Sequence, residues 1–121
     1  MYNIFKTIIT SLSIIILYAC FGSLSMEFNS AKTYVRVEKN LIEGEEWALK
    51  ALDKEPDNAQ IPFFLAIEVY RPQKEYNKMN AMFKEALKRN SNLKLEQPFL
   101  TEDGKEIKTI HDAIYYHYSL Q

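Results

Sequence analysis

Two segments of the chain carry the same apolar pattern 35 residues apart, and this internal repetition constrains the fold more than any other feature. Residues 41–57 align with residues 76–92, and the apolar positions recur at spacings of 3, 4 and 3 residues, which marks one face of a helix. The matched pairs are Leu41 with Tyr76, Gly44 with Met79, Ala48 with Phe83, Ala51 with Ala86, Leu52 with Leu87, Lys54 with Arg89 and Asp57 with Asn92. A repeat of this length indicates stacked supersecondary units that bury their apolar faces against each other.

Proline positions and apolar runs divide the repeated region into helices. Pro56 opens a Pro-Asp-Asn breaker, whereas Pro62 is tolerated in the first turn of a helix. Residues 61–70 are apolar nearly all round, interrupted mainly by Glu68, so a helix here must be buried on more than one side. The expected helices lie near residues 30–38, 41–55, 59–71 and 75–90.

The residues at this offset resemble the tetratricopeptide repeat, a helix-turn-helix unit of about 34 residues. The second unit matches the family at Leu65-Ala66, Tyr76, Phe83 and Ala86, and the first unit matches at Ala51 and Pro56. Ser91 stands where the family has a closing proline, and one extra residue falls near residues 71–73. The resemblance covers roughly residues 30–92. It implies an all-α fold of two tandem repeat-like units, a piece of an α-solenoid.

In the family that the chain resembles, the first helix of each unit lines a concave groove that holds peptide segments. Here the resemblance places seven residues in that groove: Thr33, Arg36, Gln60, Phe63, Ile67, Tyr70 and Arg71. The alternative for Phe63 and Ile67 is that they are simply core residues, because two repeats form a shallow groove.

The tail, residues 93–121, follows a different pattern. A strong two-residue turn signal at Asp103-Gly104 predicts a β-hairpin over residues 99–108, with Leu100 opposite Ile107 and Glu102 opposite Lys105. A helix capped by Thr109 should follow, and either the hairpin or this final helix should fold back onto helix 75–90 to cover the end of the array. Its packing face would comprise Ile110, Ala113, Ile114 and His117, with Tyr115, Tyr116 and Tyr118 partly covered. The alternative is a freely projecting helix or a truncated chain.

Residues 1–19 have the layout of a secretory signal, with Lys6 ahead of an uncharged apolar stretch. They are followed by Cys20, which is the one cysteine of the chain. The segment Leu17-Tyr18-Ala19-Cys20 resembles the lipobox of bacterial lipoproteins, which implies lipid attachment at Cys20. Residues 20–29 would then be a tether. The alternatives are an uncleaved transmembrane anchor over residues 7–24 and ordinary secretion, and all three place the folded part outside the cytoplasm.

Charge and chemistry exclude several classes of function. The formal net charge of −1 carries no basic excess for nucleic acid. His111 and His117 lie on different faces of the expected helix, and the glutamates at positions 43, 45 and 46 indicate a solvated face. We therefore expect no enzyme activity, no metal and no cofactor. The sequence predicts a membrane-anchored protein or peptide interaction module of the bacterial cell envelope. The alternatives are a structural subunit of an envelope assembly and an accessory fragment of a larger protein.

Overall fold

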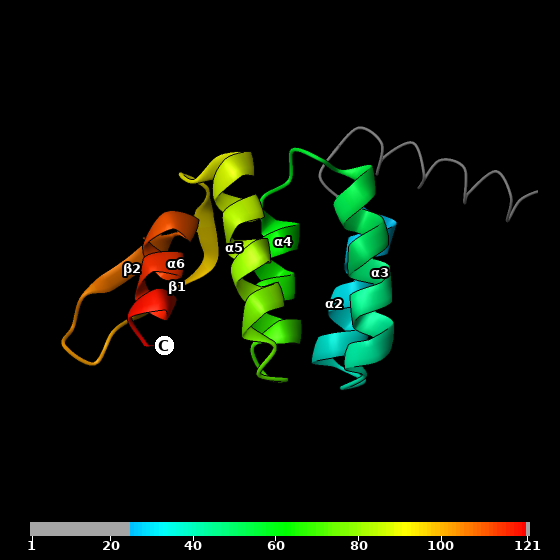
Figure 1. Cartoon of the computed structure of the whole chain (residues 1–121), viewed down its shortest axis with the longest axis horizontal. Helices are drawn as coiled ribbons and strands as arrows, with labels where there is room; N and C mark the ends of the chain where they lie inside the picture. Colours follow the sequence, from blue (N-terminus) through cyan, green and yellow to red (C-terminus); the bar gives the residue numbers. More distant parts are fainter. Residues whose placement is uncertain (1–24, 121) are drawn as a thin grey trace, which may run out of the picture.

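The computed structural model describes residues 25–120, which form a mostly helical fold with one small antiparallel sheet (Figure 1). The elements are α2 (Met26–Arg36), α3 (Leu41–Lys54), α4 (Gln60–Phe64), the π-helix η1 (Leu65–Tyr70), α5 (Tyr76–Asn90), β1 (Lys94–Leu100), β2 (Glu106–Thr109) and α6 (Ile110–Ser119). The four expected helices and the expected final helix are confirmed. The expected signal segment and the lipid attachment at Cys20 lie outside the described residues.

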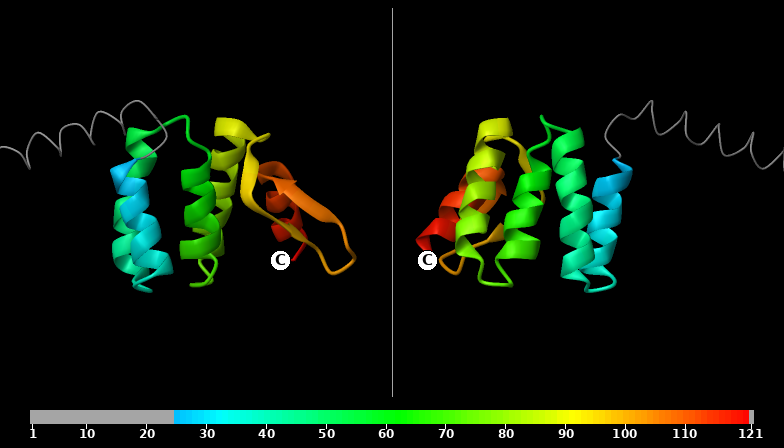
Figure 2. Two further views of the ribbon diagram at one scale, coloured as in Figure 1. Left: turned by 180° about the vertical axis from the view of Figure 1, so that it is seen from behind. Right: turned by 45° about the vertical axis from the view of Figure 1, so that its right-hand side comes forward.

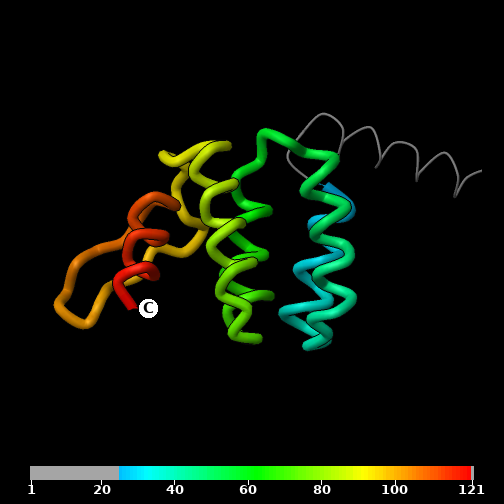
Figure 3. Tube along the Cα trace, in the orientation of Figure 1, coloured from blue at the N-terminus to red at the C-terminus, as the bar shows by residue number. Residues whose placement is uncertain are grey.

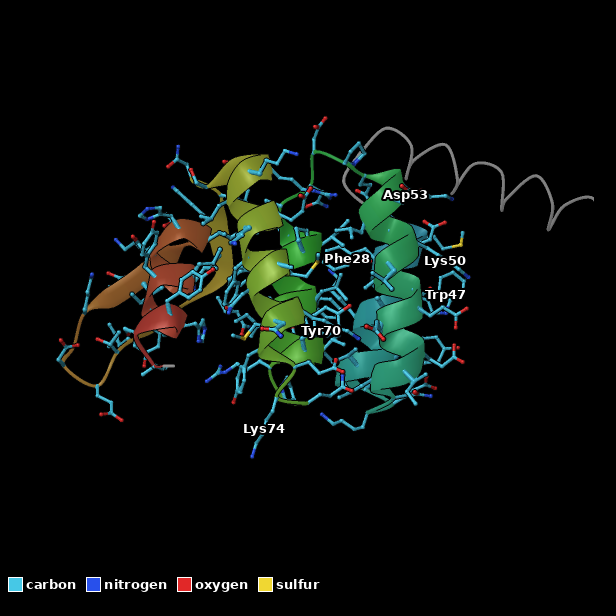
Figure 4. The ribbon with its side chains drawn as sticks, in the orientation of Figure 1. Phe28, Trp47, Lys50, Asp53, Tyr70 and Lys74 are labelled. Carbon is cyan, nitrogen blue, oxygen red and sulfur yellow. The ribbon has the colours of Figure 1, made fainter. Side chains whose placement is uncertain are left out.

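The helices form two antiparallel pairs that stand side by side, α2 with α3 and α4–η1 with α5. The chain trace in Figure 3 runs up and down through both pairs before it enters the sheet. Phe28 of α2 lies between the pairs (Figure 4), and its ring meets that of Phe64 edge-on at 5.5 Å between centroids. The aromatic side chains of the first helix of each pair thus form part of the core that joins the pairs.

Helix α2 begins earlier than its expected start near residue 30. Ser25 is the N-cap, because its Oγ accepts a hydrogen bond from the backbone N–H of Phe28 at 3.1 Å. Phe28 is 6% exposed, so burial of its ring also favours a helical conformation for residues 26–29. The final residues of the expected tether, residues 20–29, are therefore part of α2.

The extra residue expected near residues 71–73 lies next to the π-helix. Within η1 the carbonyl of Ala66 accepts from the N–H of Arg71 at 2.9 Å, which is the i→i+5 pattern. The carbonyl of Tyr70 accepts from the N–H of Glu75 at 3.0 Å with the same spacing. These wider turns contain more residues than α-helical turns and accommodate the extra residue before α5 begins.

The residues matched at the 35-residue offset occupy equivalent buried positions on α3 and α5. The buried pairs are Gly44 with Met79, Ala48 with Phe83 and Ala51 with Ala86. The expected burial of Leu65, Ala66, Phe83 and Ala86 is confirmed, since each has a relative exposure of 0%.

Arg89 joins the end of α5 to the end of α3. Its guanidinium donates to the carbonyl oxygens of Leu52, Glu55 and Asn58 at 2.9, 2.8 and 3.2 Å, and its Nε donates to Glu85 at 2.9 Å. The last carbonyls of a helix have no intrahelical partners, so this arginine satisfies groups of α3 that would otherwise depend on water. The contact also fixes the second helical pair against the first.

Gly44 allows α2 and α3 to pack closely. A Cβ atom added at Gly44 would overlap Cγ2 of Val35 and lie 3.4 Å from the carbonyl oxygen of Ala31. We expect Gly44→Val to lower the free energy of unfolding by about 1–3 kcal/mol through overpacking, measured by urea denaturation. The double variant with Val35→Ala should recover part of that loss, because it removes the overlapping methyl groups. A single variant as stable as the native chain would contradict this account of the α2–α3 contact.

The hairpin is present, but its expected register is wrong. Phe99 pairs with Ile107 and Leu100 with Glu106, in place of the expected Leu100–Ile107 and Glu102–Lys105 pairs. Gly104 has a φ of +87°, and the N–H of Thr101 donates to the carbonyl of Lys105 at 2.9 Å. The loop therefore contains three residues, with a glycine in the left-handed conformation, rather than two. Ile107 is consequently buried, and Leu100 is 68% exposed.

Helix α6 folds back onto α5, as expected from the need to cover the end of the array. Thr109 is its N-cap, with Oγ1 accepting from the N–H of Asp112 at 3.2 Å. The expected packing face is confirmed, since all four of its residues are buried: Ile110, Ala113, Ile114 and His117. The expected partial cover is confirmed for Tyr116 and Tyr118 but is wrong for Tyr115, which is 58% exposed.

Candidate functional site

A cavity with thirteen lining residues, here termed the main cavity, lies on the side of the molecule where α2, α4–η1 and β1 stand next to one another. The left view of Figure 2 shows these elements in front, with α3, α5 and α6 behind them. The cavity has a volume of about 400 Å³. Its lining residues are Arg36, Gln60, Phe63, Phe64, Ile67, Glu68, Lys94, Leu95, Glu96, Gln97, Phe99, Ile110 and His117.

Four of the seven predicted groove residues line this cavity: Arg36, Gln60, Phe63 and Ile67. Phe63 and Ile67 are half-buried and pack against the core, and the ring of Phe63 lies 6.4 Å from that of Phe83. Both interpretations of these two residues therefore apply: they belong to the edge of the core and also form the floor of the cavity.

The other three predicted groove residues lie elsewhere. Thr33 is exposed, and its hydroxyl donates to the carbonyl of Asn29 within α2 at 3.0 Å. Tyr70 is 5% exposed and belongs to the core between the helical pairs (Figure 4). Burial, together with a hydrogen bond to Glu45, raises the pKa of the Tyr70 hydroxyl. Arg71 lines a separate hollow beside α6. The structure thus does not bring the seven residues together into one continuous groove.

An ion pair between the two helical pairs forms the polar edge of the cavity. Arg36 of α2 donates from Nε to Oε1 of Glu68 at 2.8 Å and from Nη2 to Oε2 at 2.7 Å. The hydrogen bonds to Glu68 raise the pKa of the Arg36 guanidinium, which also lies 5.6 Å from the centroid of the Phe64 ring. This two-pronged geometry holds both side chains in place, since the arginine fork matches the carboxylate. Glu68 is the charged residue that interrupts the apolar run of residues 61–70, and this position could have marked it as a candidate site residue.

Strand β1 forms another wall of the cavity, and this role was not predicted from the sequence. Lys94, Leu95, Glu96, Gln97 and Phe99 all line the cavity. The start of the strand is fixed next to α6, because the N–H of Ile110 donates to the carbonyl of Leu93 at 2.9 Å. The short strand lacks a regular alternation of apolar and polar residues, so its sequence carries little signal for this role.

His117 lies between the main cavity and the separate hollow, and it lines both. Its side chain is 9% exposed, and its buried Nδ1 has no hydrogen-bond partner among residues 25–120. Burial, with a smaller effect of the nearby Arg71 charge, lowers the pKa of His117 to about 4. The imidazole is therefore neutral at pH 7 and stacks on the ring of Phe83 at 6.1 Å. It contributes an uncharged aromatic surface to the cavity.

Across the described residues, no three histidine, cysteine, aspartate or glutamate side chains are grouped in a way that could hold a metal ion. Within the same range, no helix has the length and apolar character needed to cross a membrane.

Comparison with known proteins gives no further assignment. No family model, curated protein or solved structure matches the chain. The properties of the site therefore follow from its geometry: an apolar floor, a paired charge at one edge and a strand at the other.

Proposed function

We propose that the protein is a non-catalytic interaction module that binds an extended peptide segment of a partner protein in the main cavity. The observation that carries this proposal is the lining of the main cavity, which is termed the groove from here on. Its floor is apolar, formed by residues such as Phe63 and Ile67, and its rim is polar on both sides. An apolar floor with a few placed polar groups is the usual character of a ligand site.

The module is proposed to be a short tetratricopeptide-like array. Support comes from the antiparallel helical pairs and from the equivalent buried positions on α3 and α5 at the 35-residue offset. In such an array the first helices, here α2 and α4–η1, share one face, and four of their predicted groove residues line the cavity. Helix α6 and the hairpin then cover the last apolar surface, which open repeat arrays require.

The proposed setting is the bacterial cell envelope, with the module held at a membrane by lipid on Cys20. Only residues 21–24 separate that cysteine from the start of the described residues. A chain this short spans at most about 18 Å, at about 3.6 Å per residue, so the module would stay next to the membrane. Tethering raises the effective concentration toward partners in the same membrane, and a modest affinity is then sufficient.

The test begins with random linear peptides of about 12 residues displayed on phage and selected against the purified full chain in detergent micelles. The tightest binder is then synthesised with a fluorescent label. We expect Ile67→Glu to weaken its binding by at least about tenfold in fluorescence anisotropy, because the charge replaces an apolar contact in the floor. The matched control is Ile42→Glu on α3, where the side chain is 79% exposed and does not line the cavity.

A second variant, Gln60→Trp, fills the cavity without adding charge and should block the same peptide. Helical circular dichroism of each variant checks that the fold is retained. Equal binding by all three variants and the native chain would contradict the groove as the binding site.

An envelope-assembly subunit is the second candidate, and it is favoured by exposed apolar side chains at the α5–α6 end. Tyr76, Tyr115 and Leu120 are 47%, 58% and 58% exposed. Tyr76 and Leu120 also line the hollow that contains Arg71. If Tyr115→Glu abolishes binding of the selected peptide while Ile67→Glu does not, docking occurs at this end and the assembly interpretation replaces the groove.

A further inference from the structure

Strand β1 departs from regular pairing where it lines the cavity. Lys94 is paired with Thr109 and Phe99 with Ile107, and the register shifts between these two pairs. Four residues of β1, residues 95–98, therefore stand opposite the single residue Lys108 of β2. Such a bulge leaves residues of the longer strand unpaired in the ladder, and bulges are common beside functional sites.

The bulged segment and the cavity coincide. Leu95, Glu96 and Gln97 line the cavity, and Phe99 follows directly after the bulge. The sheet among the described residues has two strands, so one edge of β1 has no neighbouring strand. Figure 2 shows that β2 lies on the side of β1 away from α4, so the open edge of β1 faces the groove. Unpaired backbone donors and acceptors at an open edge can pair with another extended chain.

We propose that the bound peptide adds as a strand along the open edge of β1 and pairs its backbone with residues 95–97. This mode of binding rests on the proposed function. Main-chain hydrogen bonds hold the peptide in an extended conformation, and its alternate side chains point to opposite faces. Pro98 has no N–H group, so it cannot donate to an added strand and limits pairing at that end of the bulge.

The charges around the groove indicate which peptide fits. Arg36 and Glu68 neutralise each other at one edge, and strand β1 contributes one charge of each sign, Lys94 and Glu96. The rim thus has no excess charge, and the floor between its two sides is apolar. The matching ligand is an extended segment with a large uncharged side chain that enters between Ile67 and Phe99. The backbone on either side of that side chain would pair with β1.

The experiment uses the peptide selected on the full chain and a series of its analogues, each with one backbone amide N-methylated. N-methylation removes one donor and leaves the side chain unchanged. Since alternate amides of a strand point to the same edge, methylation at every second position should weaken binding by at least about tenfold. Methylation at the intervening positions should change it less than about twofold. Full tolerance at every position, or losses without this alternation, would overturn strand addition.

Variants of the protein test the other side of the same contact. Glu96→Pro and Gln97→Pro each remove one backbone N–H from an exposed residue of the bulge, while Glu96→Ala and Gln97→Ala remove the side chains alone. We expect at least one proline variant to lose binding while its alanine counterpart binds normally and both keep native circular dichroism. Normal binding by both proline variants would also overturn the proposal.

The outcomes separate the two proposals. If Ile67→Glu leaves peptide binding unchanged, the groove function itself fails. If Ile67→Glu abolishes binding but N-methylation is tolerated throughout, the groove function stands and strand addition fails. Hydrogen exchange at the amides of residues 95–97 gives an independent measure, because an added strand should slow exchange there upon peptide binding.

Discussion

Replacing Phe83 with alanine should lower the free energy of unfolding by about 3–5 kcal/mol, the usual cost of removing a fully buried aromatic ring. Phe83 has 0% exposure and sits where three parts of the fold meet. Its ring lies 6.4 Å from Phe63 in the groove floor, 6.1 Å from His117 and 5.5 Å from Tyr118 in α6. The cavity left by Phe83→Ala would therefore loosen both the second helical pair and the helix that covers it.

The measurement is urea denaturation of the full chain in micelles, followed by far-ultraviolet circular dichroism. Phe83→Leu should cost less, because leucine leaves a smaller cavity at the same position. Lys84→Ala, at an exposed site one residue along α5, should change stability by less than about 0.5 kcal/mol. A loss below about 1 kcal/mol for Phe83→Ala would mean that α6 does not pack on α5 as described.

The helices could be predicted from the sequence because their signals are local. The apolar stripe of α5 and the breaker before α4 follow from residues close together in the chain. The start of α2 could not be predicted as well, because part of the reason for it is distant in sequence. Phe28 extends the helix by packing on Phe64, a contact between two different helical pairs. The π-helical geometry of η1 also depends on packing, and the sequence indicated it only as one extra residue.

The candidate site likewise has a part that could be predicted from the sequence and a part that depends on contacts between distant residues. Four of its helical residues were predicted, because the resemblance assigns a face to each first helix; they are Arg36, Gln60, Phe63 and Ile67. Its strand half was not predicted, since the position of β1 depends on the contact of Leu93 with the start of α6. The hairpin register was wrong because Asp103-Gly104 is compatible with two-residue and three-residue loops. Tyr70 lies in the core because η1 carries it to the contact between the helical pairs rather than to the groove.

Cys20→Ser should abolish both the attachment of lipid and the cleavage that releases residues 1–19. Cys20 lies outside the described residues, and the expectation rests on its place after the apolar signal-like segment. Each buried CH₂ group of an acyl chain contributes about 0.8 kcal/mol, so one chain anchors marginally and several chains on one cysteine anchor stably. Serine has no thiol to receive the diacylglycerol. The variant should therefore lose both the lipid and the cleavage that follows its attachment.

Metabolic labelling with an alkyne fatty acid, fractionation of membranes and intact mass measurement test this together. The native chain should carry the label and have the mass of residues 20–121 plus lipid, whereas Cys20→Ser should be unlabelled and retain residues 1–19. Ser23→Ala, three residues further along, should be labelled and processed like the native chain. An unlabelled native chain of full length in the membrane fraction would show instead that residues 7–24 anchor the protein without cleavage. The module would then still lie close to the membrane, because either anchor precedes α2 by only a few residues.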